Sequence, residues 1–293
     1  MEYIDKSSHR DKGIEITEDY LKSIWIQEEQ RYPVDFYGSF RSLPVKQNCF
    51  YKQMTKVLLD NQHNHCCYCM RRLTGDGDTT LEHIVPQAAD NDMLQEYQKH
   101  KDEFPMFGED VIKLSGSFTK EVNPPLPPYP HTVSYDNLVA SCYGLFPKLK
   151  NDEVVDDRSG HCCNNVRGKT PILPIYLIPD VSSLLVYCVN GIAIEKDDSA
   201  WEKAVREVII SARLNWKTLV DIRQLWYVLK DVNIEEINAC KDDSAKRLDL
   251  LQDNLYLTDI NQDRIEDLIN KFRKDSYWNC FLLYDWFHSI NWN

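Results

Sequence analysis

The chain has 293 residues, of which 43% are hydrophobic and 27% charged, and 34 Lys and Arg against 46 Asp and Glu give a formal net charge of −12. This composition is typical of a soluble protein with a large core, and it excludes a membrane span, because no window approaches the roughly 18 apolar residues needed. Residues 1–20 contain no apolar run of the secretory type, so we expect a cytoplasmic protein. The acidic charge disfavours unaided binding of nucleic acid, since each phosphate contact requires a cation. Either acidic residues coat solvent-facing helices, or a partner supplies the affinity for DNA.

Two helices are predicted in residues 1–62. Residues 17–31 open with Thr17, a possible N-cap, and repeat their apolar residues at helical spacing. Residues 34–43 are predicted to be a turn-rich connector. Residues 45–62 are predicted to form a second helix, with four apolar side chains directed inward: Phe50, Met54, Val57 and Leu58.

The stretch HNHCCYCMRRLTGDGDTTLEHIVPQ, residues 63–87, contains two chemically informative pairs. Cys66 and Cys69 have the two-residue gap that lets both sulfurs of one tight turn reach a zinc ion at about 2.3 Å. Glu82 and His83 place a carboxylate beside a base in a short β-prone run. A cysteine pair of this kind requires a second pair elsewhere in the chain.

Residues 88–134 are a polar segment that ends in VNPPLPPYP. Proline fixes φ and removes a donor, so residues 122–130 should be extended and loop-like rather than strand or helix. The segment is either a spacer or a docking ligand for an aromatic groove. It is a candidate lid or partner contact beside an active site.

A second set of cysteines follows in YDNLVASC, residues 135–142, and HCCNNVRGK, residues 161–169. Cys142 and Cys163 are candidates for the remaining two thiolate ligands, with Cys162 possible instead of Cys163. In a reducing compartment such clusters favour metal over disulfides. Cys67 lies inside the first pair, and we expect it to pack inward. With four protein ligands the zinc would be structural.

Beyond this region, residues 183–196 read SLLVYCVNGIAIEK, and Asn190-Gly191 predicts a β-hairpin with a two-residue turn in which both central residues have φ > 0. From residue 199 onward the apolar spacing is helical. Helices are expected around residues 201–209, 219–226, 234–251, 260–273 and 278–286.

Read in order, the chain gives Cys, Cys, Glu-His, Asn-Leu, Cys, Cys-Asn and Arg-Gly, and here it resembles the HNH endonucleases with a ββα-metal fold. With MEYIDK, LLDNQHNHCCYCMRRL, LEHIVPQ and RLNWKTLVDIR included, it looks like the HNH subunits of the Septu antiphage system, of the PtuB type, and like retron-associated HNH proteins.

The resemblance implies a role for each matching residue. His83 would be the general base, Asn137 would hold the connecting loop and orient the His ring, and Glu82 with Asn164 would bind a catalytic Mg²⁺ or Mn²⁺. Glu82 and His83 can both reach one site only if the strand ends or twists there. Arg167 and Lys169 would contact substrate phosphates.

The predicted fold class is α+β, with a ββα-metal core braced by a zinc site of four cysteines, N-terminal helices, and a mainly helical C-terminal region preceded by a β-hairpin. The expected divisions are residues 1–62, a nuclease core at 63–173 with the insertion 88–134, and a partner-binding region at 174–293. The resemblance implies DNA as substrate and an ATPase resembling PtuA as partner.

Two alternatives to this interpretation are a stand-alone HNH nuclease of restriction type and a zinc-knuckle module that binds but does not cleave. The acidic charge argues against the first alternative, which needs its own basic surface for DNA. The Glu-His pair together with Asn164 argues against the second.

Overall fold

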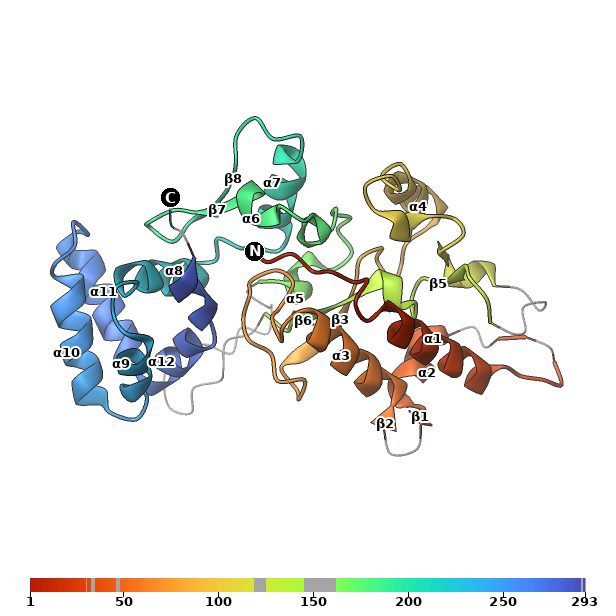
Figure 1. Ribbon diagram of the computed structural model, residues 1–293, viewed down its shortest axis with the longest axis horizontal. Coiled ribbons are helices and arrows are strands. Elements are labelled where there is room, and N and C mark those ends of the chain that lie inside the picture. Colours follow the sequence, from red (N-terminus) through yellow and green to blue (C-terminus); the bar gives the residue numbers. More distant parts are fainter. Residues whose placement is uncertain are drawn as a thin grey trace. The chain divides into compact units, whose positions relative to one another are not determined.

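The structure is a computed structural model that describes residues 1–29, 31–32, 35–45, 48–118, 125–144, 162–290 and 292. The chain divides into two compact units, each described separately. We call residues 1–68, 73–143 and 167–181 the strand-pair unit, and residues 69–72, 144–166 and 182–293 the helical unit. Helices and two-stranded sheets make a mixed fold (Figure 1). Across the described ranges, no helix has the length and apolar character to cross a membrane.

Three helices open the strand-pair unit: α1 (Arg10–Ile24), α2 (Phe36–Ser42) and α3 (Phe50–Asn61). The predicted N-cap at Thr17 is wrong, because α1 begins at Arg10 and the buried Thr17 hydroxyl donates to the carbonyl of Gly13 at 3.1 Å. The residues expected to be a connector contain α2, whose N-cap Asp35 accepts a hydrogen bond from the Gly38 N–H at 2.9 Å.

Aromatic packing joins these helices. The ring of Tyr20 lies edge-on to Phe40 and Phe50, with centroids 4.9 and 5.2 Å apart. The inward positions predicted for α3 are confirmed, since Phe50, Met54, Val57 and Leu58 are all buried. The three N-terminal helices lie in the strand-pair unit together with residues 79–83.

The central sheet is an antiparallel pair of β3 (Thr79–His83) and β6 (Leu138–Cys142), in which Thr79 faces Cys142 and His83 faces Leu138. The Gln62 side chain extends this pairing. Its amide oxygen accepts from the Ala140 N–H at 2.7 Å, and its amide nitrogen donates to the Ala140 carbonyl at 2.8 Å. A side chain thus supplies hydrogen bonds that a third strand would otherwise make.

Smaller elements complete the strand-pair unit. β1 (Pro44–Val45) pairs antiparallel with β2 (Asn48–Cys49), and β4 (Ile112–Lys113) pairs parallel with β5 (Tyr129–Pro130). Residues 122–124 of the proline-rich stretch lie outside the described residues. The expectation of a loop is wrong for Tyr129 and Pro130, which form β5. The remaining elements are α4 (Asn91–Gln98), η1 (Pro105–Phe107), η2 (Ser115–Ser117), η3 (Tyr135–Asn137) and η4 (Ile175–Leu177).

The predicted hairpin is present as β7 (Leu185–Tyr187) and β8 (Ala193–Glu195), but its turn is longer than expected. Gly191 has φ of 83°, whereas Asn190 is not among the residues with positive φ. The Asn190 side chain instead accepts from the Ile192 N–H at 3.1 Å, and the Cys188 N–H donates to the Ile192 carbonyl at 2.8 Å. A three-residue turn with glycine in the left-handed region replaces the two-residue turn.

Helices build the rest of the helical unit, as the spacing predicts, although residues 234–251 contain two helices instead of one. Asp243 interrupts that stretch by N-capping the second helix, accepting from the N–H groups of Ala245 and Lys246. The elements are α5 (Asn164–Arg167), α6 (Val181–Leu184), α7 (Glu202–Ser211), α8 (Lys217–Val228), α9 (Ile234–Ala239), α10 (Ser244–Leu255), α11 (Gln262–Phe272), α12 (Asp275–Leu282) and η5 (Asp285–Ser289).

Candidate metal centre and active site

Four buried cysteines form the one group of His, Cys, Asp and Glu side chains that could hold a metal ion in the described ranges. The Sγ atoms of Cys66, Cys69, Cys142 and Cys163 lie within 4.8 Å of one another. Tetrahedral zinc with Zn–S bonds of about 2.3 Å places its sulfurs about 3.8 Å apart, so the four thiols fit such an ion after a small contraction. The cysteine set predicted from spacing and motif order is the set that the fold brings together.

Of the two candidates Cys162 and Cys163, the cluster contains Cys163. The backbone of Cys163 has φ of 59°, in the left-handed region. Cys162 Sγ lies 3.9 Å from the Gly144 carbonyl oxygen and 3.5 Å from Cys163 Sγ. Cys67 is buried, as expected, and is not part of the cluster.

Polar hydrogens face the cluster. The Cys142 N–H donates to Cys66 Sγ at 3.3 Å, and the Tyr284 hydroxyl lies 3.8 Å from Cys69 Sγ. Donors of this kind stabilise the thiolate form that metal binding requires.

His83 ends β3 with its ring largely buried, at 8% exposure. Its Nε2 lies 2.9 Å from the carbonyl oxygen of Thr132. A carbonyl only accepts, so Nε2 carries the proton and Nδ1 keeps its lone pair. Among the described residues, Nδ1 has no hydrogen-bond partner. The fully buried polar atoms without a partner do not include it. Burial lowers the pKa of His83 to about 4, so the ring is neutral near pH 7.

Asn137 ties two loops together beside His83. Its side-chain oxygen accepts from the Val85 N–H at 2.7 Å, and its amide nitrogen donates to the carbonyls of Val85 at 3.0 Å and His131 at 2.7 Å. The Asn side chain thereby joins the segment that follows β3 to the segment that contains Thr132, the partner of the His83 ring. Asn137 therefore holds the loop by side-chain hydrogen bonds and does not itself bond the His83 ring.

Glu82 does not fit the predicted role of a catalytic metal ligand. β3 is regular through His83, so Glu82 and His83 point to opposite faces of the strand. The buried Glu82 carboxylate accepts from the Tyr68 hydroxyl at 3.0 Å and pairs with Arg167. A carboxylate committed in this way does not suit Mg²⁺, which keeps much of its water shell.

Arg167, expected to contact phosphate, is only 2% exposed and turns its donors inward. Its terminal nitrogens donate to the Glu82 carboxylate and to the carbonyls of His83 at 2.5 Å and Ile84 at 2.7 Å. Its Nε donates to the backbone carbonyl of Thr170 at 3.1 Å. The guanidinium therefore holds the end of β3 from inside the unit. A cation this deep is not placed to contact a phosphate.

The structure thus brings Glu82, His83, Asn137 and Arg167 into one network, although not in the roles predicted for all of them. Asn164 is the first residue of α5. Lys169 follows α5, is exposed, and makes no ion pair with any residue in the described ranges. His161, which crowds the same turn in the sequence, lies outside the described residues.

Two contributors to the surroundings of His83 have no sequence signal. Thr132 acts through its backbone carbonyl, which any residue would supply. Tyr37 lies with its ring 4.8 Å from that of His83, at an interplanar angle of 76°, and comes from a helix that the sequence did not predict.

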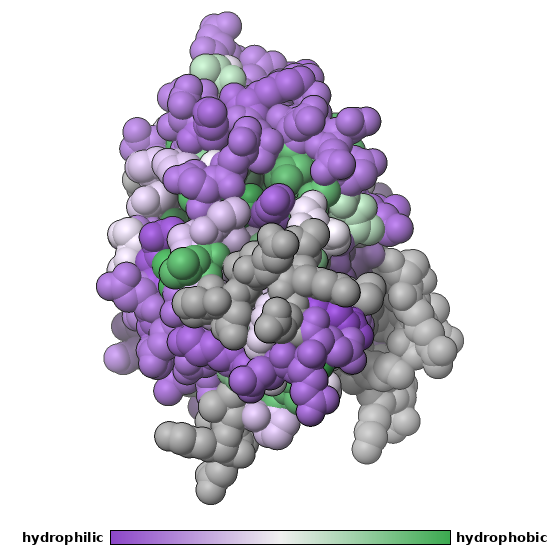
Figure 2. All heavy atoms as spheres, turned by 90° about the vertical axis from the view of Figure 1, so that its right-hand side faces the viewer, coloured by the Kyte–Doolittle hydropathy of each residue, from purple (hydrophilic) through white to green (hydrophobic). Residues whose placement is uncertain are grey.

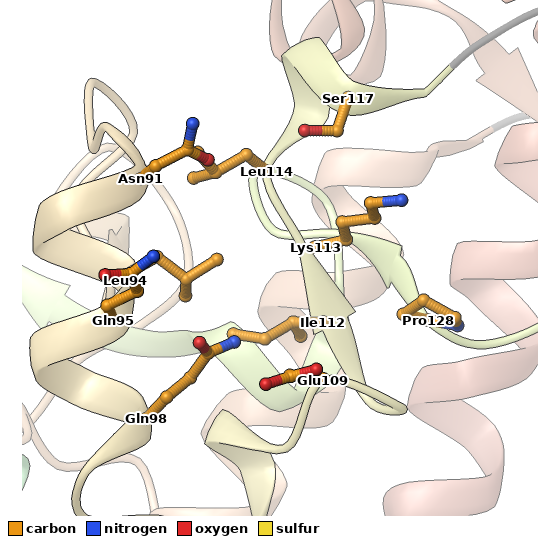
Figure 3. Close-up of a pocket in the computed structure, with 10 residues that line it drawn as sticks. All are labelled: Asn91, Leu94, Gln95, Gln98, Glu109, Ile112, Lys113, Leu114, Ser117 and Pro128. Atoms are coloured by element: carbon orange, nitrogen blue, oxygen red, sulfur yellow. The ribbon is translucent and has the colours of Figure 1, made fainter.

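A separate pocket of about 390 Å³ lies within the 88–134 segment (Figure 3). The side chains of Asn91, Leu94, Gln95 and Gln98 face it from α4, and those of Ile112 and Leu114 lie opposite. The rim is polar and the floor apolar, since Leu94 and Ile112 are buried.

Comparisons with family models, curated proteins and solved structures found no match.

Proposed function

We propose that this chain is a metal-dependent HNH endonuclease that hydrolyses DNA phosphodiester bonds, and that it acts as the effector nuclease of a Septu-like antiphage complex with a PtuA-like ATPase. The observation that carries the catalytic part is the state of His83. A backbone carbonyl fixes Nε2 as the donor, and Nδ1 keeps a free lone pair. A neutral, oriented imidazole is what a general base requires.

The remainder of the reaction is assigned by chemistry. His83 Nδ1 takes a proton from water as that water attacks phosphorus, and the 3′ oxygen departs. A divalent ion such as Mg²⁺ or Mn²⁺ would stabilise charge on the phosphate and the leaving oxygen. Asn164 is the proposed oxygen ligand that remains once Glu82 is paired with Arg167. A structural Zn²⁺ held by the four cysteines would brace the strand pair.

The support for the defence assignment is the order of sequence landmarks and the net charge of −12, which favours DNA affinity supplied by a partner. A second candidate is a zinc-knuckle module that binds but does not cleave. The burial of His83 and the inward commitment of Glu82 and Arg167 favour that candidate.

A plasmid cleavage assay separates the two. The purified chain is incubated with plasmid, with and without Mg²⁺ or Mn²⁺ and with and without the ATPase. His83→Ala should lower the rate by about 10²- to 10⁴-fold while zinc content and folding persist. Because burial lowers the pKa of His83 to about 4, the wild-type rate should hold as pH falls below 6.5 and decline only near that lower value.

The matched control is His288→Ala. His288 Nε2 also lies 2.9 Å from a backbone carbonyl, that of Val232, in the helical unit. This substitution removes the same kind of contact and should leave cleavage unchanged. A folded, zinc-loaded His83→Ala protein that cleaves at the wild-type rate would remove His83 from the mechanism. A wild-type chain that cleaves under none of these conditions would refute the nuclease and leave the binding module.

A further inference from the structure

A nucleic acid that approaches His83 needs a cation, and Arg167 cannot supply it. The donors of Arg167 are directed to oxygens inside the strand-pair unit. In a chain with a net charge of −12, an exposed cation close to His83 is a candidate for contacting a phosphate. Within the described residues, α2 provides one.

Tyr37 of α2 partly covers His83. The two rings meet edge-on with centroids 4.8 Å apart, and the phenol is only half-buried. A substrate that reaches the His83 ring must therefore pass close to Tyr37.

Arg41 lies one helical turn after Tyr37, on the same side of α2. Its guanidinium carbon is 5.6 Å from the centroid of the Tyr51 ring. Arg41 is exposed and forms no ion pair with any residue that the structure describes. An arginine held over an aromatic ring keeps its planar set of donors available for a phosphate.

Tyr51 connects Arg41 to β3, because the Tyr51 hydroxyl accepts from the Leu81 N–H at 3.3 Å. Leu81 precedes His83 by two residues on β3. A third phenol lies nearby, that of Tyr143, directly after β6. Burial raises the pKa of both Tyr37 and Tyr51, and the neighbouring Tyr143 raises both further.

Three half-buried tyrosines and one exposed arginine make up this set, which we call the Tyr–Arg subsite: Tyr37, Arg41, Tyr51 and Tyr143. Aromatic rings interleaved with a cation are the pattern that binds single-stranded nucleic acid, since each base presents a π face and each phosphate a charge. A paired base buries its faces against its neighbours. The subsite therefore suits an unpaired nucleotide.

The face of the molecule in Figure 2 is mostly hydrophilic, with hydrophobic residues in small separate areas. Among the coloured residues of that face, hydrophobic side chains form no broad surface.

We propose that the Tyr–Arg subsite binds one phosphate of a DNA strand through Arg41 and the adjoining unpaired nucleotide through the tyrosine rings. The proposal rests on the proposed function, because it supplies substrate to His83. It adds a binding site and a preference for unpaired DNA.

The test is binding of a fluorescent single-stranded oligonucleotide by the full-length chain at several salt concentrations, without added divalent ion. Arg41→Ala should weaken binding about tenfold at low salt and reduce the slope of log K against log salt by about 0.7, the value for one phosphate on a single strand. Tyr37→Ala should weaken binding on the order of tenfold, whereas Tyr37→Phe should retain it.

Arg273→Ala is the matched control. Arg273 is also exposed and makes no ion pair within the described residues, but it follows α11 in the helical unit. This variant should reproduce the wild-type affinity and slope.

The outcomes are separable. An Arg41→Ala slope equal to the wild-type slope, or a wild-type chain that binds no single strand at low salt, would overturn the subsite. Tighter binding of a DNA duplex than of a single strand would overturn the proposed preference for an unpaired nucleotide. Binding that depends on Arg41 and Tyr37 without any cleavage would refute the nuclease and keep the subsite. Cleavage that requires His83 but not Arg41 would refute the subsite alone.

Discussion

Both units contain aromatic packing, but their buried polar side chains bind backbone groups at different places: at strands and loops in the strand-pair unit, and at helix ends in the helical unit. In the helical unit the core is aromatic: the rings of Trp226 and Phe281 stack with centroids 4.1 Å apart, and Trp278 lies 4.9 Å from Phe281. In the strand-pair unit, buried side chains bind backbone groups, as Gln62 does at Ala140. Helices satisfy their own backbone, whereas loops and short strands need partners from elsewhere. A site built on loops therefore depends on polar side chains that cannot be exchanged for apolar ones.

The helical unit also has a polar anchor, at helix ends. Arg247 is fully buried and donates to the carbonyls of Cys240, Lys241 and Arg273, with a further contact to Asp275 at 2.9 Å. These carbonyls follow α9 and α11, where a helix leaves its last acceptors unsatisfied. One arginine thus closes two helix ends.

The largest effect is expected from the cysteine cluster. Cys142→Ser should reduce zinc from about one ion per chain to near zero and destabilise the strand-pair unit most, because binding of structural zinc contributes about 10 kcal/mol or more to folding. Elemental analysis and limited proteolysis measure both. Cys188→Ser, at a half-buried thiol outside the cluster, should leave zinc in place. A zinc-free wild-type protein would refute the structural zinc.

A smaller loss is expected at the anchor of the helical unit. Arg247→Met keeps the volume but removes the guanidinium donors to the carbonyls of Cys240, Lys241 and Arg273, and should lower the free energy of unfolding by about 3 kcal/mol. Urea denaturation gives the value. Arg206→Met is the control, since Arg206 pairs with Glu195 and Glu202 at the surface and should lower the free energy of unfolding far less than Arg247→Met does. Equal losses in the two variants would show that the anchor adds nothing beyond a surface pair.

The smallest of these three losses of stability is expected at the loop beside His83. Asn137→Ala removes hydrogen bonds to Val85 and His131 and should cost about 2 kcal/mol, with zinc retained. Asn254→Ala, which removes one bond to the Leu250 carbonyl within α10, should cost less than about 1 kcal/mol. Denaturation monitored by tryptophan fluorescence compares them. If both variants unfold at the same denaturant concentration as wild type, side-chain bonds do not hold the loops.

Local patterns predicted the elements that depend on local rules. The apolar spacing in α3 predicts its buried face, because helix periodicity alone determines which side chains share a side. The same reasoning missed α2, where the N-cap Asp35 and the buried Phe36 and Phe40 are a short signal inside a turn-rich composition. In the hairpin, Asn190-Gly191 marks the turn correctly but not its length, and a side chain at position 191 would collide with the Val220 carbonyl.

The sequence by itself determined Cys66, Cys69 and Cys142 as candidate ligands with Cys162 or Cys163, a β-strand at Glu82 and His83, and the mainly helical C-terminal region. Ligand spacing and periodicity are local properties of a chain. Only the tertiary structure decided that Glu82 and Arg167, 85 positions apart in the chain, neutralise each other inside the strand-pair unit, and that the Thr132 carbonyl sets the protonated nitrogen of His83. Such partners are chosen by which surfaces the fold buries together, and a buried charge must then pair with whatever opposite charge the fold places beside it.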